Sequence, residues 1–409
     1  MKQMHLSSIG SRHSPTIATK TVLLLSGSMT IMGSVMVAPV IPQIIAHFSG
    51  NEGAALLVQL AITGPALAIS VFSPLAGMLA DVVGRKRLLV LATFFYAFLG
   101  AAPTLIQHLP WLVATRVLFG VAEAVVMTCV MTLIGEYWQG SQRLGVINLQ
   151  VITIGLIGTA LYLLGGWVGE DEWRNPFLLY LVPILLIPLM KRFLFEPERP
   201  YTGKHPSSQV QHALKWKPLL SGYSAIFFGM ILAFVVPIQS PFLLMSLGIH
   251  STLDFAALSA WSLFISLAGS LIWPYMLRHL GVAVTHGVTF ILFSGAIWLM
   301  CRADSYQAML VAVTLHGVAC GIFPPNAMAP VMASLTDQTR AKGMGCFTSL
   351  LYFGQFLSPV LVAILVRLNT DLRAGLNALA IISVFYAAAW IAAAVMARFS
   401  SSIHQQLGL

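Results

Sequence analysis

The sequence predicts an all-α membrane protein whose twelve transmembrane helices form two pseudo-symmetric six-helix bundles (6+6). Of its 409 residues, 58% are hydrophobic and 9% are charged, and the mean hydropathy is +0.85. Soluble domains average about 45–50% apolar and about 25% charged residues. The chain therefore has too few polar residues to cover the surface of a soluble enzyme. Two further observations, the apolar runs and an internal repeat, give the number and the grouping of the helices.

Each predicted helix is an apolar run long enough to cross a bilayer, which takes about 20 residues. Open sheet edges cannot exist in hydrocarbon, so the runs are predicted to be helices. The first run follows a polar tail and is too long for a signal-peptide core, so we expect it to be retained. Pro39 and Pro42 should bend or end that helix. The runs cover residues 21–47, 54–80, 88–107, 110–134, 145–168, 176–195, 217–238, 255–277, 283–301, 305–333, 343–367 and 374–397.

Basic residues predict the orientation, because cytoplasmic loops carry an excess of Lys and Arg. With both termini in the cytoplasm, the inner loops and tails hold most of the 22 Lys and Arg. The net charge of +9 is therefore mainly a topology signal, and no clustered basic face indicates a nucleic-acid partner. We expect a multi-pass protein of the inner (plasma) membrane that contacts the lipid bilayer.

The chain is predicted to consist of two related halves joined by a polar linker. A shift of 197 residues places Gly84 on Gly281 and Gly120 on Gly317, which indicates an internal repeat. Parallel six-helix repeats place a substrate site at the bilayer midplane between the halves. The predicted segments are a cytoplasmic tail (1–20), an N-terminal bundle (21–195), a cytoplasmic linker (196–216), a C-terminal bundle (217–397) and a second cytoplasmic tail (398–409).

A motif of glycines, one acid and three cations lies between the second and third runs. Gly77 permits close helix approach, and Asp81 can accept hydrogen bonds from the N-terminus of a neighbouring helix. Gly84 allows a sharp turn. The cations would hold the loop at the anionic inner leaflet, or they serve only as topology determinants. The motif comprises Gly77, Asp81, Gly84, Arg85, Lys86 and Arg87.

This motif resembles the G-x-L-a-D-x-x-G-R-[KR]-[KR] signature of the major facilitator superfamily. With twelve runs and a central linker, the resemblance covers nearly the whole chain. It implies a secondary transporter that works by alternating access. It also implies that Asp81 caps the inner end of the eleventh predicted helix, residues 343–367, in the outward-open state. Arg85 would pair with an acid at the inner end of the fourth predicted helix, residues 110–134, where Glu136 stands. Together these residues would form a conformational latch.

Two charged residues, Arg116 and Glu123, lie inside the fourth run. Charges at membrane depth cost several kcal/mol, so they are functional candidates. They share a helix face but lie about 10 Å apart along the axis, so we expect them to bracket one wet cavity without a direct ion pair. We expect Glu123 to bind the proton or a cationic substrate, and the alternative is a structural carboxyl bonded to a neighbouring helix. The segment resembles a second family motif, whose Arg is tied to proton transfer in proton-coupled members.

Other polar residues at membrane depth are weaker candidates. His316 could relay protons, although a lone helical His more often satisfies packing. Eight polar or aromatic residues could line the substrate cavity, although each alone more often serves packing. The set suits a moderately hydrophobic compound better than a sugar, which needs many paired donors and acceptors. These cavity candidates are Gln150, Tyr162, Tyr223, Gln239, Trp261, Asn326, Tyr352 and Gln355.

No cofactor or metal is expected. The four cysteines lie in apolar runs without ligand spacing, and no G-x-x-x-x-G-K-[ST] segment is present. Too few acids, His or Cys converge in the spans for a membrane-embedded enzyme. The Pro39–Pro42 segment and the glycines of residues 155–166 partly resemble the drug–proton antiporter branch, but the Gly-Pro pair of that branch is absent. We expect proton-coupled efflux of a small, moderately hydrophobic drug or metabolite by a monomer, with proton symport or facilitated uptake as the alternative.

Overall fold

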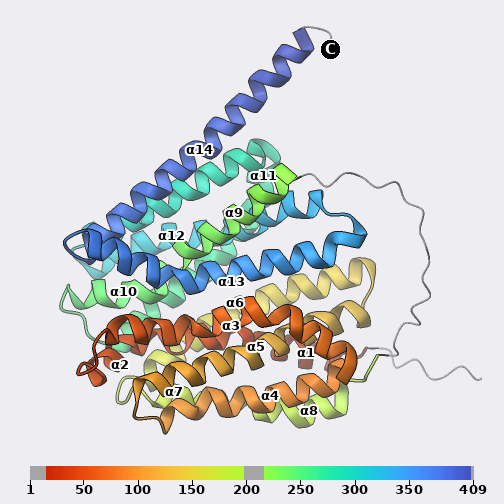
Figure 1. The fold of residues 1–409 in the computed structure, drawn as a ribbon, viewed down its shortest axis with the longest axis vertical. Coiled ribbons are helices and arrows are strands. Elements are labelled where there is room, and N and C mark those ends of the chain that lie inside the picture. The colour runs from red at the N-terminus through yellow and green to blue at the C-terminus, as the bar shows by residue number, and fades with distance from the viewer. Residues whose placement is uncertain (1–14, 198–215, 407–409) are drawn as a thin grey trace, which may run out of the picture.

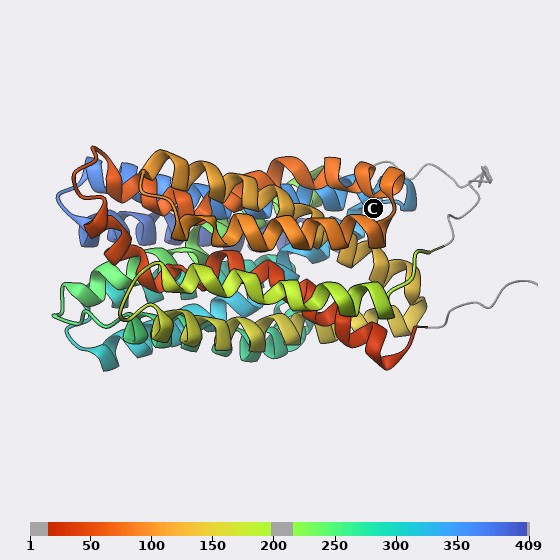
Figure 2. The same cartoon turned by 90° about the horizontal axis from the view of Figure 1, so that it is seen from below.

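The structure is a computed structural model that describes residues 15–197 and 216–406. Within these ranges the chain is helical, with short turns and no β-strand, which confirms the all-α prediction for this part of the chain. Figure 1 shows the N-terminal elements gathered on one side of the molecule and the C-terminal elements on the other. Figure 2 shows that the helices run mostly along one common direction.

The N-terminal group contains two irregular segments. As predicted from its prolines, the first apolar run breaks, and a 3₁₀ turn with Pro39 separates two helices. The run predicted over 176–195 is one continuous helical span, Asn175–Phe193, whose middle is a 3₁₀ segment that contains Pro183, a residue that cannot donate a helical hydrogen bond. The elements are α1 Ile17–Val35, η1 Ala38–Val40, α2 Ile41–His47, α3 Ala54–Val83, α4 Arg85–Ala101, η2 Ala102–Thr104, α5 Leu109–Tyr137, α6 Gly140–Val168, α7 Asn175–Leu178, η3 Leu179–Leu185 and α8 Leu186–Phe193.

The C-terminal group contains a segment longer than one bilayer crossing. Eleven segments of the described chain are long and apolar enough to span a membrane, and one of them covers 51 residues. That segment leaves helical geometry at Gly281, where φ is 74° and ψ is 171°. The two runs predicted over 255–277 and 283–301 therefore appear as one element with an internal kink. The elements are α9 Trp216–Ala233, α10 Val235–Met245, α11 Thr252–Arg302, α12 Tyr306–Ser334, α13 Asp337–Leu368 and α14 Leu372–Gln406.

Backbone contacts repeat between the two groups at the offset found in the sequence. Gly84 and Gly281 both adopt positive φ, where a side chain would be strained. A Cβ on Gly120 would overlap the backbone of Pro65, and a Cβ on Gly317 would overlap the carbonyl of Ser262. Each of these three pairs is related by the same 197-residue shift. The same close helix crossing therefore occurs once in each group.

The two groups meet mainly along two pairs of helices, α6 with α11 and α3 with α13, and α10 and α11 add smaller contacts with η1 and α2. We name the ends of the bundle after two residues. The Arg85 end carries the start of α4, and the Glu170 end carries the end of α6 and the start of α11. At the Glu170 end the groups are in close contact, since a Cβ on Gly166 would lie 2.8 Å from the carbonyl oxygen of Thr252.

Candidate functional site

A small cavity lies where α13 meets the N-terminal group. Its volume is about 20 Å³, enough for about one water molecule. Glu123, on α5, is the only acid in its lining and is 2% exposed. Within the described residues the Glu123 carboxylate forms no ion pair. The lining residues come from α1, α3, α5 and α13 and are Gly33, Ser34, Ile62, Pro65, Ala66, Ile69, Glu123, Tyr352 and Gln355.

Gly33 stands between the two buried charges. A Cβ on Gly33 would lie 2.7 Å from Glu123 Oε2, so the carboxylate packs directly against this glycine. On the other side, Arg116 Nη2 donates to the Gly33 carbonyl at 2.7 Å. The two charges therefore contact one glycine of α1 from different directions and do not pair with each other.

Arg116 is enclosed by aromatic rings, away from the cavity. The side chain is 0% exposed, and its guanidinium lies 4.3 Å from the Phe119 ring centroid and 5.2 Å from that of Tyr180. The Tyr180 hydroxyl donates to the Met32 carbonyl at 2.9 Å, which ties the ring to α1. Arg116 Nε and Nη1 have no hydrogen-bond partner in the described chain. Cation–π attraction thus replaces part of the hydration that the buried cation has lost.

His316 lies inside the C-terminal group and does not line the cavity. Its Nδ1 is 3.1 Å from Ser262 Oγ, and its Nε2 is 3.2 Å from the Leu232 carbonyl oxygen. Cys320 Sγ is 3.5 Å from Nδ1. Both ring nitrogens therefore have neighbours that connect α9, α11 and α12, as a packing histidine would. At the 197-residue offset, His316 corresponds to Phe119, the ring beside Arg116.

Two of the eight cavity candidates, Tyr352 and Gln355, line the cavity with Glu123. Four others bond to neighbouring elements: Gln150 Nε2 to Leu24 O (3.2 Å), Tyr223 OH to Gly343 O (2.9 Å), Trp261 Nε1 to Thr314 Oγ1 (2.8 Å) and Asn326 Nδ2 to Val282 O (3.0 Å). Tyr162 and Gln239 are buried on α6 and α10. The cavity therefore gathers a smaller set than the sequence suggested.

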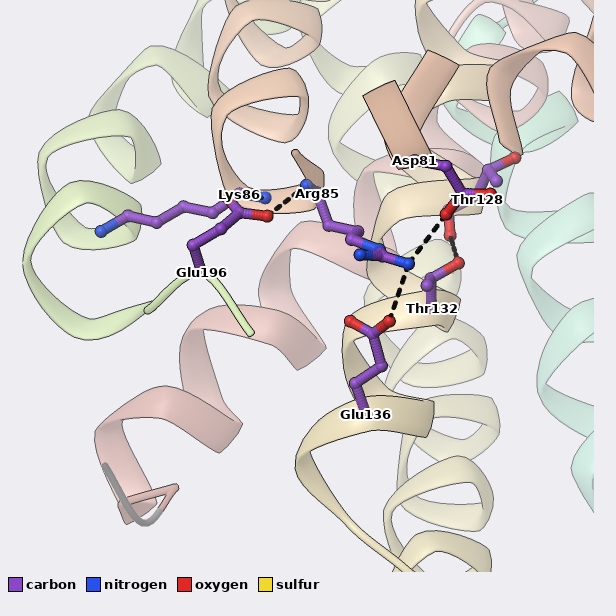
Figure 3. Close-up of polar contacts among 7 residues, drawn as sticks. All are labelled: Asp81, Arg85, Lys86, Thr128, Thr132, Glu136 and Glu196. Carbon is purple, nitrogen blue, oxygen red and sulfur yellow. Dashed lines mark hydrogen bonds and ion pairs between the residues drawn. The ribbon is translucent and has the colours of Figure 1, made fainter. Parts of the chain in front are cut away.

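The glycine-and-cation motif forms an ionic cluster at the Arg85 end (Figure 3). Arg85 Nη2 lies 2.8 Å from Asp81 Oδ1 and 3.1 Å from Glu136 Oε1. The Arg85 side chain is 12% exposed, whereas that of Asp81 is 68% exposed. Arg85 thus connects the end of α3 to the end of α5: it pairs with Glu136, the partner that the family resemblance implied, and also with Asp81, which was expected to cap a helix of the other group.

Glu196, which sequence reasoning missed as a site residue, caps the start of α4. Its Oε1 accepts from the Arg85 backbone N–H at 2.5 Å, and its Oε2 accepts from the Lys86 N–H at 3.1 Å (Figure 3). Lys86 Nζ donates to the Lys191 carbonyl at 2.9 Å. A carboxylate is favourable at a helix N-terminus because unpaired amides and the helix dipole meet there. The available sequence signal was an acid directly after the last N-terminal helix.

The remaining residues of the motif lie outside the ionic cluster of Arg85. A Cβ on Gly77 would lie 3.9 Å from Thr128 Cγ2, an ordinary contact, so no close approach depends on Gly77 in this conformation. Gly84 has φ of 102°, which the predicted sharp turn requires. Arg87 is exposed. The first turn of α13 has its own capping box from Thr336, while Asp81 bonds to Arg85.

A second capping carboxylate, Glu170, joins the two groups at the Glu170 end. Its Oε2 accepts from the Leu253 backbone N–H at 3.1 Å and lies 3.1 Å from Thr252 Oγ1. Thr252 Oγ1 also lies 2.8 Å from the Gly166 carbonyl oxygen. We call these residues, with Ala256 against Gly166, the Glu170 seam. The seam caps the first turn of α11 with an acid that follows α6, and its sequence signal was the run of three acids at residues 170–172, shortly after a Gly-Gly pair.

Known proteins resemble this chain over most of its length. A family model described as Major Facilitator Superfamily matches residues 23–282. The chain is 26% identical over 345 residues to the multidrug efflux protein YfmO of Bacillus subtilis, covering 82% of this chain and 83% of that protein. It is 24% identical over 309 residues to the 3-(3-hydroxy-phenyl)propionate transporter of Escherichia coli, covering 72% and 74%.

The fold also resembles a solved structure. A bacterial homolog of the human lysosomal transporter Spinster, in an inward-facing and unoccupied conformation, superposes with a TM-score of 0.74 at 15% sequence identity. The match covers 93% of this chain and 97% of that chain. The similarity therefore extends over the whole fold and is not limited to one group of helices.

Proposed function

Because the chain belongs to the Major Facilitator Superfamily and is a multi-pass membrane protein, we propose that it exports a small, moderately hydrophobic organic compound in exchange for protons. Proteins of this family carry small molecules across membranes and are not enzymes. Export is favoured by the similarity to a relative named as a multidrug efflux protein. The alternative is uptake by symport or facilitated transport, which the similarity to a hydroxyphenylpropionate transporter keeps open.

The proposed architecture is twelve spans in two bundles of six, with both termini in the cytoplasm. Division of the 51-residue α11 at Gly281 turns eleven candidate spans into twelve. A straight helix of that length would extend about 77 Å, more than twice the hydrocarbon core of about 30 Å. The repeated contacts of Gly120 and Gly317 support two related bundles. In this orientation the protein lies in the inner membrane and its Arg85 end faces the cytoplasm. We further propose that it works as a monomer.

The observation that carries proton coupling is the position of Glu123. Its carboxylate lies in a cavity between an N-terminal helix and α13, and no ion pair within the described chain neutralises it. An unpaired carboxylate at this depth costs several kcal/mol, and either a proton or a cationic substrate removes that cost. Because residues of both bundles line the cavity, relative movement of the bundles changes access to the carboxylate. Glu123 is therefore the proposed coupling residue, and Arg116 fixes α1 beside it.

In the proposed orientation the Glu170 end is the outer side, so the structure would be a state closed at that side. The Glu170 seam holds the bundles together at the Glu170 end. In the proposed cycle, this seam opens when the opposite end closes. Asp81 then leaves Arg85 and caps α13, as the family resemblance implies. Asp81 and Glu170 would therefore cap their helices in alternation, one in each state of the cycle.

The test uses the purified protein in proteoliposomes that contain a pH-sensitive dye. A proton gradient is imposed and a panel of hydrophobic organic cations and neutral drugs is added. We expect substrate-induced proton efflux in the native protein and its loss in Glu123→Gln. Glu52→Gln, an exposed carboxylate outside the cavity, is the matched control and should retain the signal.

Two outcomes would contradict the proposal. Proton movement that persists in Glu123→Gln would assign coupling to another group. Substrate flux without proton movement in the native protein would establish a facilitator. Proton entry together with a substrate that accumulates inside would instead support the uptake alternative.

A further inference from the structure

A groove between α11 and α14, which shares no lining residue with the Glu123 cavity, has a volume of about 530 Å³. Two hydrogen bonds hold its walls together: Ser294 Oγ donates to the Ala380 carbonyl, and Ser383 Oγ donates to the Phe290 carbonyl, both at 2.8 Å. The lining residues are Ile291, Ser294, Gly295, Trp298 and Arg302 on α11, and Asn377, Ala380, Ile381 and Val384 on α14. Neither the proposed cycle nor the coupling site uses this groove.

The groove opens on a surface that faces the membrane. Ile291, Trp298, Ile381 and Val384 are apolar, exposed residues on candidate spans, so hydrocarbon is the medium that contacts them. From Ile291 to Arg302 the groove face of α11 rises about 17 Å, at about 1.5 Å per residue. That rise is slightly more than half of a hydrocarbon core of about 30 Å. The groove therefore spans about one leaflet, as a single acyl chain would.

A cation lies at the mouth of the groove. The Arg302 guanidinium stacks 4.2 Å above the Trp298 ring and, among the described residues, forms no ion pair. Arg302 lies at the Glu170 end of the bundle. Next to it, Arg373 donates hydrogen bonds to the Cys301 carbonyl and to Ser246 Oγ, and Ser246 lies shortly before the start of α11 at that end. An exposed cation over an interfacial Trp is suited to a headgroup phosphate, since Arg binds phosphate by charge-assisted hydrogen bonds.

An unpaired acceptor belongs to another lining residue of the same groove. The Oδ1 of Asn377 is buried and has no hydrogen-bond partner in the described chain. A buried acceptor without a donor costs about 1–3 kcal/mol, so the site favours a ligand that carries a hydroxyl. Phosphate, hydroxyl and acyl chain occur together in a phospholipid with a glycerol headgroup.

We propose that the groove binds one anionic phospholipid with a hydroxylated headgroup, such as phosphatidylglycerol. Its acyl chain lies between Ile291 and Val384, its phosphate contacts Arg302, and a headgroup hydroxyl donates to Asn377. The bound lipid links α11 to α14 on the membrane face of the C-terminal bundle. This site is independent of the transported compound and of its direction.

The test is native mass spectrometry of the full-length protein released from micelles that contain phosphatidylglycerol or phosphatidylcholine. The native protein should retain one phosphatidylglycerol and bind phosphatidylcholine more weakly. Arg302→Gln should bind phosphatidylglycerol about tenfold more weakly, as expected when one charge-assisted hydrogen bond is lost. The matched control is Arg367→Gln, another exposed arginine in the last turn of a helix at the same end, which should bind like the native protein.

Three outcomes would overturn the proposal. Equal retention of both lipids would show that headgroup chemistry is not recognised. An equal loss in Arg302→Gln and Arg367→Gln would reduce the effect to general surface charge. A dimer that dissociates when Val384 is replaced by a polar residue would show that a second copy of the chain covers the groove.

Discussion

Replacement of Gly166 by Ala places one methyl group inside the Glu170 seam. The new Cβ would lie 2.8 Å from the Thr252 carbonyl oxygen and 3.2 Å from the Leu253 Cα, and it would overlap the Cβ of Ala256. All three neighbours belong to the start of α11, in the opposite group of helices. Two of the contacting atoms are backbone atoms, which cannot move aside as the end of a flexible side chain could.

The cost of this methyl group falls on the closed state alone. Overpacking of a tight contact costs about 1–3 kcal/mol. When α6 and α11 separate at this end, the methyl group has open space and the cost disappears. A difference of that size changes the ratio of closed to open molecules by about 5- to 150-fold. The sign is fixed by the geometry: Gly166→Ala should favour the state that is open at the Glu170 end.

The assay measures the distance between spin labels on the two sides of the seam. Asn51→Cys and His250→Cys place labels on exposed residues of the N-terminal and C-terminal groups at this end. Cys346, the exposed native cysteine, is replaced by Ser. We expect a longer distance population to grow in Gly166→Ala. Gly145→Ala is the matched control, because it lies on the same helix and a Cβ there would meet nothing within 4 Å.

One result would refute the reasoning. If Gly166→Ala and Gly145→Ala give the same distance distribution while only Gly166→Ala lowers the melting temperature, the close contact stabilises the fold in every state. The Glu170 seam would then be a permanent joint and could not open during transport.

Two further predictions concern the N-terminal bundle. Arg116→Lys should lower the free energy of unfolding by about 1–3 kcal/mol in thermal unfolding, because an ammonium cannot stack on the surrounding rings while bonding to Gly33. Arg87→Lys, at an exposed cation, is the control and should leave the melting temperature unchanged. Equal melting temperatures of the two variants would contradict this role of Arg116. Glu196→Gln should cost about 1 kcal/mol, since the amide caps the start of α4 less well than the carboxylate. Glu52→Gln is the control for that variant, and an unchanged melting temperature in Glu196→Gln would show that the cap adds no stability.

The sequence predicted the regular part of the fold because span length and apolar composition are local properties. The 3₁₀ segment around Pro183 was missed, since an apolar run does not reveal how a proline in it will be accommodated. The positive φ shared by Gly84 and Gly281 could be anticipated from the repeat offset. The repeat therefore carried structural information that hydropathy alone did not.

The candidate site was predictable in its charges but not in its geometry. Glu123 and Arg116 stood out because charges are rare at membrane depth. Their common neighbour Gly33 lies about 80–90 residues earlier in the chain, and only tertiary packing brings it between them. Glu196 and Glu170 were missed for a related reason, since each caps a helix that is distant in the sequence.

The contact at Gly33 has a consequence for genetic variation in this chain. A residue without a side chain holds the guanidinium by its carbonyl group, and its missing Cβ leaves the volume that the carboxylate of Glu123 fills. Every amino-acid substitution at Gly33 adds a Cβ atom where that carboxylate now lies. The charge chemistry of the cavity is therefore encoded in part by an apolar position with no functional group, and a search restricted to polar residues would overlook it.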